Sequence, residues 1–419
     1  MLLVGVSLPQ IPVWEAEDSL EELSRLAHTA ALHERARVLQ NRQRVDPTYY
    51  LGKGKAAELK PLAQDCGADL IVFDNDLAPA QMRNLEKLTG LRILDRSGLI
   101  LDIFAQHART HTAQLQVELA QLNYLLPRLT RQWSHLSRQA GGGAIRGMGA
   151  VGVRGPGETQ LEIDRRLIRR RISELTLKLE RISGQLATSR KGRRDAFKVA
   201  LVGYTNAGKS TLMRALSGAQ VLVANQLFAT LDSTTRAVEL DQGRKILLTD
   251  TVGFIRRLPH HLFASFHGTL EEAVQADLLL HVVDMSHPHY EQQQTTVAGV
   301  LRELGLEDKP TLLVFNKIDR VDPGEQERLA HHWAQQAGAV AVSARSGVGL
   351  RMLREKILYY SQEEEITVDL HIPQQEGRLL SQLHHQGEVL AQDFADDQVH
   401  LRVRLDRSWV RRWGLERYA

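Results

Sequence analysis

The chain of 419 residues is long enough for two to four domains, each with a core of its own. Its 53 lysines and arginines against 50 acidic residues leave a net charge of only +3, so a nucleic-acid-binding face has to come from where the charges lie. The single cysteine, Cys66, excludes an internal disulfide framework. No signal sequence or run of membrane-spanning length is apparent, so we expect a cytoplasmic monomer that is not inserted in a membrane, although it can associate with a membrane surface.

Residues 1–111 alternate strand-like and helix-like segments, which predicts a small α/β domain. Continuous apolar runs indicate buried strands, and apolar residues three and four apart indicate helices packed on them. The expected strands are residues 2–8, 70–73 and 91–94, and the expected helices are residues 15–31, 56–64 and 79–88.

Two short sequence patterns in this domain are compatible with ligand binding, but each also has a simpler structural explanation. Residues 51–55, Leu-Gly-Lys-Gly-Lys, open a helix and can bind an anion or a second nucleotide, but a plain turn before a helix explains them more simply. His107 and His111 stand four apart on one expected helix, as zinc ligands do. Because no third ligand is in view, solvated histidines are the simpler interpretation.

The pattern then changes to two heptad ladders, which begin at Leu115 and Ile168. Apolar residues alternately four and three apart predict two helices packed along one seam. Eight glycines in residues 139–157 predict a flexible connection between them. Residues 112–188 are therefore expected to form an antiparallel coiled-coil hairpin with a kink or break at Pro127.

The charges of this hairpin are mostly positive. Residues 128–171 hold ten arginines, no lysine and three acidic residues. Guanidinium groups match phosphate, and a glycine-rich tip can follow an irregular RNA surface, so RNA binding is our preferred interpretation. A solubilising helix pair or a self-association stalk is the alternative. The candidate RNA contacts are Arg138, Arg146, Arg154, Arg165, Arg166, Arg169 and Arg170.

A phosphate-binding loop follows in residues 203–211, Gly-Tyr-Thr-Asn-Ala-Gly-Lys-Ser-Thr. The apolar residues 199–202 before it predict the order strand, loop, helix that this motif requires. Its glycines allow a tight turn, Lys209 reaches the β- and γ-phosphates, and Ser210 is a candidate Mg²⁺ ligand. Asn206 either holds a potassium ion near the phosphates or stabilises the loop.

Four further motifs follow in the order of a GTPase. Residues 227–232 contain Thr230, a candidate second Mg²⁺ ligand on a mobile loop. The sequence DTVG then supplies Asp250, which can hold Mg²⁺ through water, and Gly253, whose N–H can contact the γ-phosphate. The NKID and SAR motifs complete the set, with the Asp319 carboxylate placed to accept from the N1–H and the amine of guanine, a donor pair that adenine lacks.

These motifs define the predicted site. Lys209, Thr230 and Gly253 are assigned to catalysis. The predicted nucleotide-binding residues are Gly203, Tyr204, Thr205, Asn206, Ala207, Gly208, Lys209, Ser210, Thr211, Phe228, Thr230, Asp250, Gly253, Asn316, Lys317, Asp319, Ser343, Ala344 and Arg345.

The remaining boundaries follow from composition. Residues 195–361 are assigned to the GTPase domain, after a polar linker at residues 186–194. Residues 366–419 are assigned to a small C-terminal α+β domain, with strands at residues 367–372 and 398–405 and a helix near residues 377–384.

In combination, the motifs resemble the HflX family of translational GTPases. The resemblance extends from about Tyr49 to about Leu350 and is carried by RGPGETQLEIDRR at 154–166, GYTNAGKS at 203–210, NQLFATLD at 225–232, DTVGFIRRLPH at 250–260 and NKID at 316–319. It implies a multidomain α/β protein whose P-loop GTPase domain follows an α/β domain with a helical hairpin. It further implies that the hairpin tip approaches the peptidyl-transferase centre of the large ribosomal subunit and that stalled or idle ribosomes are split into subunits.

Two features bear on that function. Residues 144–151 extend the compact tip that the family pattern has, and Phe254 stands where many GTPases carry a water-orienting glutamine. Phe254 either leaves hydrolysis slow until the large subunit stimulates it, or packs the switch while another residue positions the water. Other possible functions are large-subunit assembly and nucleotide-regulated RNA remodelling; the lack of a second complete phosphate loop argues against the latter.

Overall fold

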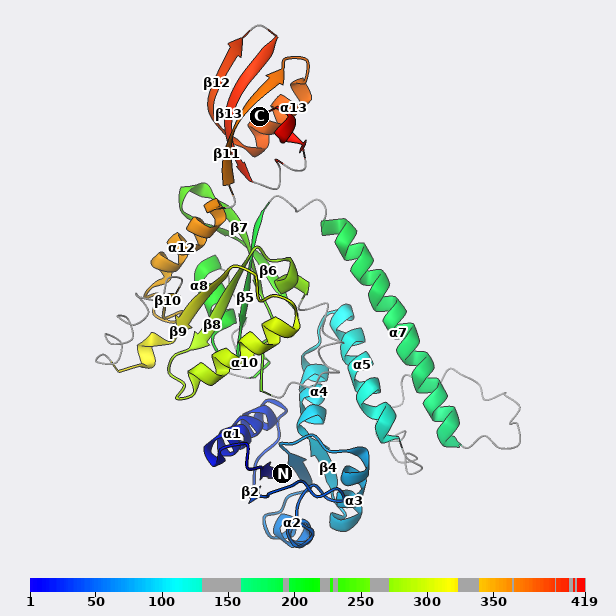
Figure 1. Ribbon diagram of the computed structural model, residues 1–419. Helices are drawn as coiled ribbons and strands as arrows, with labels where there is room; N and C mark the ends of the chain where they lie inside the picture. The colour runs from blue at the N-terminus through cyan, green and yellow to red at the C-terminus, as the bar shows by residue number, and fades with distance from the viewer. Residues whose placement is uncertain are drawn as a thin grey trace.

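The computed structural model describes residues 1–129, 160–190, 196–218, 227–228, 233–256, 271–322, 339–363, 365–395, 397–406, 410 and 413–418. Within these residues the chain forms three separate sheets with their helices and a pair of long helices beside them (Figure 1). The predicted multidomain α/β class is therefore confirmed. Among the described helices none is long and apolar enough to cross a membrane.

The N-terminal sheet is parallel throughout, in the order β2-β1-β3-β4. A helix connects each strand to the next, as parallel pairing requires. Its strands are β1 Leu2–Ser7, β2 Ala36–Asn41, β3 Leu70–Phe73 and β4 Arg92–Asp95, and its helices are α1 Val13–Thr29, α2 Lys53–Asp65, α3 Pro79–Thr89 and α4 Arg96–His107. Strand β2 and helix α4 lie outside the predicted elements. The edge strand β2 is mostly half-exposed and so lacks a continuous apolar run.

Two helices form the predicted hairpin, α5 His111–Leu125 and α7 Gln160–Arg190. Leu175 of α7 is fully buried with Leu115 and Leu119 of α5, so the two ladders meet in one seam. Arg171 binds Glu118 through two hydrogen bonds of 2.7 and 2.9 Å. The antiparallel hairpin is thus confirmed over the described part of the chain.

Three local expectations can be compared with this hairpin. Helix α5 gives way to a 3₁₀ turn, Leu126–Arg128, which confirms the predicted break at Pro127. The placement of His107 and His111 on one helix is wrong, because His107 ends α4 and His111 begins α5. No group of three potential metal ligands occurs among the described residues. The polar linker is also corrected in part, since α7 continues to Arg190.

The GTPase sheet has the order β10-β9-β8-β5-β7-β6, with only β6 antiparallel to its neighbour among the described strands. Helices α8 Lys209–Ser217, α10 Tyr290–Glu303 and α12 Leu350–Glu363 accompany it. The strands are β5 Phe197–Gly203, β6 Thr234–Glu239, β7 Lys245–Asp250, β8 Leu278–Asp284, β9 Thr311–Asn316 and β10 Ala339–Ala341. The carboxyl ends of the parallel strands therefore share one edge, where ligands bind in such sheets.

The C-terminal sheet is antiparallel, in the order β11-β13-β12. Its elements are β11 Glu365–Pro373, α13 Gly377–Gln386, β12 Glu388–Ala395 and β13 Gln398–Asp406. One face, which includes Leu370 and Leu401, is buried in a cluster with Leu383 of α13. Strand β12 was not predicted, because its register shifts between Val389 and Ala391 and the alternation of apolar residues is interrupted there.

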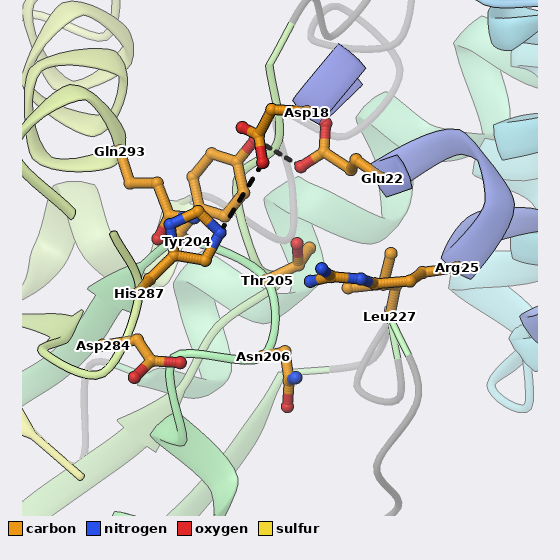
Figure 2. Close-up of a pocket in the computed structure, with 10 residues that line it drawn as sticks. All are labelled: Asp18, Glu22, Arg25, Tyr204, Thr205, Asn206, Leu227, Asp284, His287 and Gln293. Atoms are coloured by element: carbon orange, nitrogen blue, oxygen red, sulfur yellow. Dashed lines mark hydrogen bonds and ion pairs between the residues drawn. The ribbon is translucent and has the colours of Figure 1, made fainter. Parts of the chain in front are cut away.

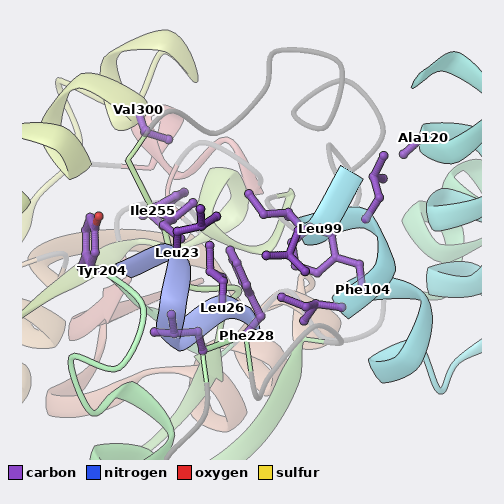
Figure 3. Packing of buried hydrophobic residues seen from close by; sticks show 14 of the residues in the cluster. Leu23, Leu26, Leu99, Phe104, Ala120, Tyr204, Phe228, Ile255 and Val300 are labelled. Atoms are coloured by element: carbon purple, nitrogen blue, oxygen red, sulfur yellow. The ribbon is translucent and has the colours of Figure 1, made fainter. Parts of the chain in front are cut away.

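A single hydrophobic cluster joins the N-terminal α/β part to the GTPase part (Figure 3). Leu23 and Leu26 of α1 and Leu99 of α4 lie in the same cluster as Tyr204 of the phosphate loop and Ile255 of the segment after Gly253. The N-terminal part therefore packs directly against the region where the nucleotide motifs meet.

Candidate functional site

The phosphate loop connects β5 to α8 in a conformation that requires glycine at two positions. Gly203 has φ +151° and Gly208 has φ +96°. A Cβ atom would lie 2.3 Å from the Val282 carbonyl oxygen at the first position and 2.2 Å from Asn316 Nδ2 at the second. Because α8 begins at Lys209, its N-terminus lies at this loop, where its first backbone N–H groups favour an anion.

Lys209 is the cation of the loop. Its side chain is buried, and its ammonium group donates to the carbonyl oxygens of Gly203 at 3.1 Å and Tyr204 at 2.9 Å. Burial lowers the pKa of Lys209 to about 8, while the negative charge of Asp250 opposes that shift. A Cβ built on Gly253 would lie 2.9 Å from this ammonium, so the two residues assigned to the γ-phosphate lie together.

Two predicted Mg²⁺ ligands also converge. The Ser210 hydroxyl donates to Asp250 Oδ2 at 2.6 Å, and Asp250 stands at the end of β7. A hydroxyl and a carboxylate are the hard oxygen donors that Mg²⁺ prefers, so the pair fits this ion. Thr230, the other candidate ligand, lies outside the described residues.

The NKID motif is anchored to the phosphate loop at the end of β9. The Asn316 side chain donates to the Ala207 carbonyl oxygen at 2.9 Å and accepts from the Ala344 N–H at 3.0 Å. One buried amide thus ties together the loop, the NKID motif and the SAR motif.

The other residues of these two motifs lie around that anchor. Ser343 donates to Asp319 Oδ1 at 2.6 Å, which orients the carboxylate predicted to select guanine. Lys317 pairs with Asp284 at 2.6 Å, while the side chain of Arg345 is exposed. Thr211 is half-buried in the first turn of α8. The predicted guanine-binding residues are therefore neighbours in space.

The Phe228 side chain packs in the core. It was predicted to contact the nucleotide; its side chain is only 2% exposed, and the centre of its ring lies 4.7 Å from that of Phe104 on α4 in an edge-to-face contact. Leu227 lies in the same cluster. The hydrophobic effect therefore places these two apolar residues, just before Thr230, in the core shared with the N-terminal part.

Tyr204 joins the phosphate loop to the N-terminal part. Its hydroxyl donates to Glu22 of α1 and accepts the backbone N–H of Arg256 at 2.9 Å. Burial and the Glu22 charge raise the pKa of Tyr204 well above its ordinary value. Arg256 in turn pairs with Asp18 of α1 at 2.8 Å, so α1 holds both the loop and the segment after Gly253.

The network continues from α1 to the hairpin. The buried Arg96 guanidinium binds Glu22 and, at 2.7 Å, Asp74. The neighbouring residue Asp95 accepts from the Tyr124 hydroxyl at 2.7 Å and from Arg128 at 2.9 Å. Tyr124 lies near the end of α5, and Arg128 lies in the 3₁₀ turn that follows it.

Sequence patterns alone did not identify this network. A weak signal exists in α1, where charged residues at positions 18, 22 and 25 recur on one helical face. These three residues line a cavity of about 30 Å³ together with Thr205 and Asn206 of the phosphate loop (Figure 2). The N-terminal part therefore forms one wall of this small cavity beside the phosphate loop.

The candidate RNA contacts fall into two groups. Arg166, Arg169 and Arg170 are exposed near the start of α7, whereas Arg165 is half-buried and lies 3.4 Å from the Leu129 carbonyl oxygen. Three more, Arg138, Arg146 and Arg154, lie outside the described residues.

Comparisons with known proteins agree with this arrangement. Family models described as GTP-binding GTPase N-terminal, GTP-binding GTPase Middle Region and 50S ribosome-binding GTPase match residues 17–105, 107–193 and 198–317. GTPase HflX of Escherichia coli (strain K12) is 43% identical over 391 residues, which cover 93% of this chain and 90% of that protein. GTPase HflX of Alkalihalophilus pseudofirmus is 50% identical over 308 residues, which cover 73% of this chain and 71% of that protein.

One solved structure that resembles the chain is a GTP-binding protein from the archaeon Sulfolobus solfataricus in complex with GDP. It is 24% identical, with a TM-score of 0.44, over 87% of this chain and 99% of that chain. The identities to the curated relatives, which extend over most of the chain, establish the relationship without it. The chain belongs to the HflX family of GTPases.

Proposed function

We propose that this GTPase binds the large ribosomal subunit through its arginine-rich hairpin and splits stalled or idle ribosomes into subunits. The hydrolysis of GTP follows from the family, and the large subunit is the partner proposed from the family resemblance. The exposed arginines on α7 support phosphate contacts with ribosomal RNA. The extended tip, residues 144–151, is proposed to approach the peptidyl-transferase centre.

The observation that carries this proposal is the contact path between the phosphate loop and the hairpin. It runs from Tyr204 through Glu22 to Arg96, whose neighbour Asp95 holds Tyr124 and Arg128. A change in the loop that alters the Tyr204 contact therefore acts on the part of the molecule that positions the hairpin. That is what a nucleotide-controlled splitting factor needs.

The nucleotide site is proposed to use Mg²⁺ held by Ser210 and Thr230 directly and by Asp250 through water. When bound, Mg²⁺ neutralises charge on the β- and γ-phosphates. Asp319 is proposed to select guanine, and Lys209 and the Gly253 N–H to contact the γ-phosphate. Asn206 is proposed either to hold a potassium ion or to stabilise the loop, and its exposed side chain is compatible with both.

Light scattering of purified ribosomes tests the splitting activity. Dissociation is expected with GTP and with a non-hydrolysable GTP analogue, and not with GDP, because the triphosphate state is proposed to act. Binding to the large subunit without dissociation in any nucleotide state would contradict splitting and favour a role in large-subunit assembly.

Two variants separate binding from splitting. Replacing Arg166, Arg169 and Arg170 together by Ala should reduce large-subunit affinity and its dependence on salt, with intrinsic GTPase activity unchanged. Arg165 is left in place because it contacts the Leu129 carbonyl oxygen. Deleting residues 144–151 should leave GTP binding intact and reduce splitting more than binding. Full affinity in the triple variant would contradict the RNA contacts.

A further inference from the structure

The face of α1 that meets the phosphate loop carries a positive charge at Arg25. Asp18 and Glu22 on the same face are engaged with Arg256, Tyr204 and Arg96. Figure 2 shows the guanidinium group of Arg25 directed from α1 toward Thr205, with Asn206 on the adjacent wall. An arginine from the N-terminal part thus faces the loop that binds phosphate.

Lys209 and Gly253 show which part of the phosphate loop Arg25 faces. Lys209 donates to the carbonyl oxygens of Gly203 and Tyr204, and a Cβ on Gly253 would lie 2.8 Å from Thr205 Cα. The Lys209 ammonium and the Gly253 N–H are the groups that meet the γ-phosphate in this kind of site. Thr205 therefore marks the γ-phosphate end of the loop, and Arg25 approaches that end.

The contacts of Arg25 leave its charge available. Its ion pair with Glu21 is long, 3.7 Å, and the two side chains are 51% and 44% exposed. Such an exposed pair contributes little stability, so the guanidinium can exchange it for a phosphate oxygen at small cost. Its charge also lowers the pKa of His287, a further residue of the cavity, although burial of His287 is the larger cause.

We propose that Arg25 places its guanidinium beside the γ-phosphate of bound GTP and stabilises the charge that develops during hydrolysis. In that reaction the water oxygen forms a bond to the γ-phosphorus while the bond from phosphorus to the β–γ bridging oxygen breaks. The bridging oxygen leaves with the electron pair as part of GDP, and a water proton passes to the phosphate product. Arginine at this position offsets charge that spreads over the leaving and equatorial oxygens.

A potassium ion on Asn206 is the competing source of positive charge, because Asn206 lines the same cavity. The two sources make different predictions. If Arg25 supplies the charge, its loss slows hydrolysis in sodium and potassium salts alike. If potassium supplies it, Arg25 is dispensable and Asn206→Ala abolishes a potassium-dependent rate.

The test compares Arg25→Ala and Arg25→Lys with the parent protein in multiple-turnover GTP hydrolysis. We expect kcat to fall about tenfold or more in Arg25→Ala, less than for a fully enclosed arginine because the side chain is half-exposed, and to recover in part in Arg25→Lys. Affinity for GDP should stay within about twofold, since GDP lacks the γ-phosphate, while affinity for GDP with aluminium fluoride should fall with kcat.

Glu21→Gln is the matched control, because it removes the charge of the ion-pair partner and keeps the guanidinium. Its kcat should equal that of the parent protein. The proposal is overturned if Arg25→Ala hydrolyses GTP within about twofold of the parent rate. It is also overturned if kcat, GDP affinity and the thermal midpoint fall together, because Arg25 would then only hold α1 in place.

Discussion

The Tyr204 hydroxyl offers a direct test of whether the phosphate loop and the N-terminal part form one energetic unit. The side chain is 5% exposed and makes two hydrogen bonds, one to the Glu22 carboxylate and one from the Arg256 N–H. Tyr204→Phe removes both and leaves a backbone donor without its acceptor. Losing a charge-assisted bond and burying an unpaired donor should cost about 2–4 kcal/mol of unfolding free energy. The loss should not be larger, because Glu22 keeps Arg96 as its partner.

Urea denaturation of Tyr204→Phe, Glu22→Gln and the double variant measures this contribution as a double-mutant cycle. We expect a coupling free energy of about 1–2 kcal/mol between the two side chains, and faster hydrogen exchange in α1 in each single variant. Additive effects of Tyr204→Phe and Glu22→Gln would refute the direct link.

Three other measurements address the nucleotide site. Asp319→Asn should weaken GTP binding by about 2–4 kcal/mol and improve binding of xanthine nucleotide, because the carboxylate that pairs with guanine is lost; unchanged GTP affinity would contradict the assignment. With the pKa of Lys209 lowered to about 8, binding should require proton uptake above that pH, so GTP affinity should be constant at lower pH and fall up to about tenfold per pH unit above it. Lys209→Ala should bind GTP weakly, with an affinity that does not depend on pH in this range. A GTP affinity of the parent protein that stays constant above pH 8 would contradict the role of Lys209. Because the Phe254 ring cannot orient water, GTP turnover should be slow alone and faster with large subunits; equal rates would contradict stimulation.

The nucleotide motifs could be predicted because their chemistry is local. The phosphate loop follows a predicted buried strand, and the parallel sheet brings its end beside the ends of β7 and β9, which carry Asp250 and Asn316. The contacts of Ser210 with Asp250 and of Asn316 with Ala344 fit that expectation. The heptad ladders were equally informative, because a period of alternating three and four residues specifies which faces of two helices meet.

The wall that the N-terminal part contributes could not be predicted in the same way. Tyr204 and Glu22 are 182 positions apart, and neither departs from the local pattern of its own element. Phe228 illustrates the difficulty, since an aromatic residue near a nucleotide motif suits base stacking as well as core packing. The position of Phe104 opposite its ring shows the core packing, which the sequence does not indicate.

The interface between the N-terminal part and the GTPase part contains buried charges as well as apolar residues. This composition affects how a bound nucleotide can move α1. An apolar interface alone can slide with little change in free energy, whereas the buried Arg96 guanidinium must keep Glu22 and Asp74 close to it. Separating a buried charge from one partner costs about 3–5 kcal/mol. Intermediate positions of α1 are therefore unfavourable. We expect the phosphate loop and the end of α5 to change together between two discrete arrangements, and a gradual shift of α1 across nucleotide states would contradict this expectation.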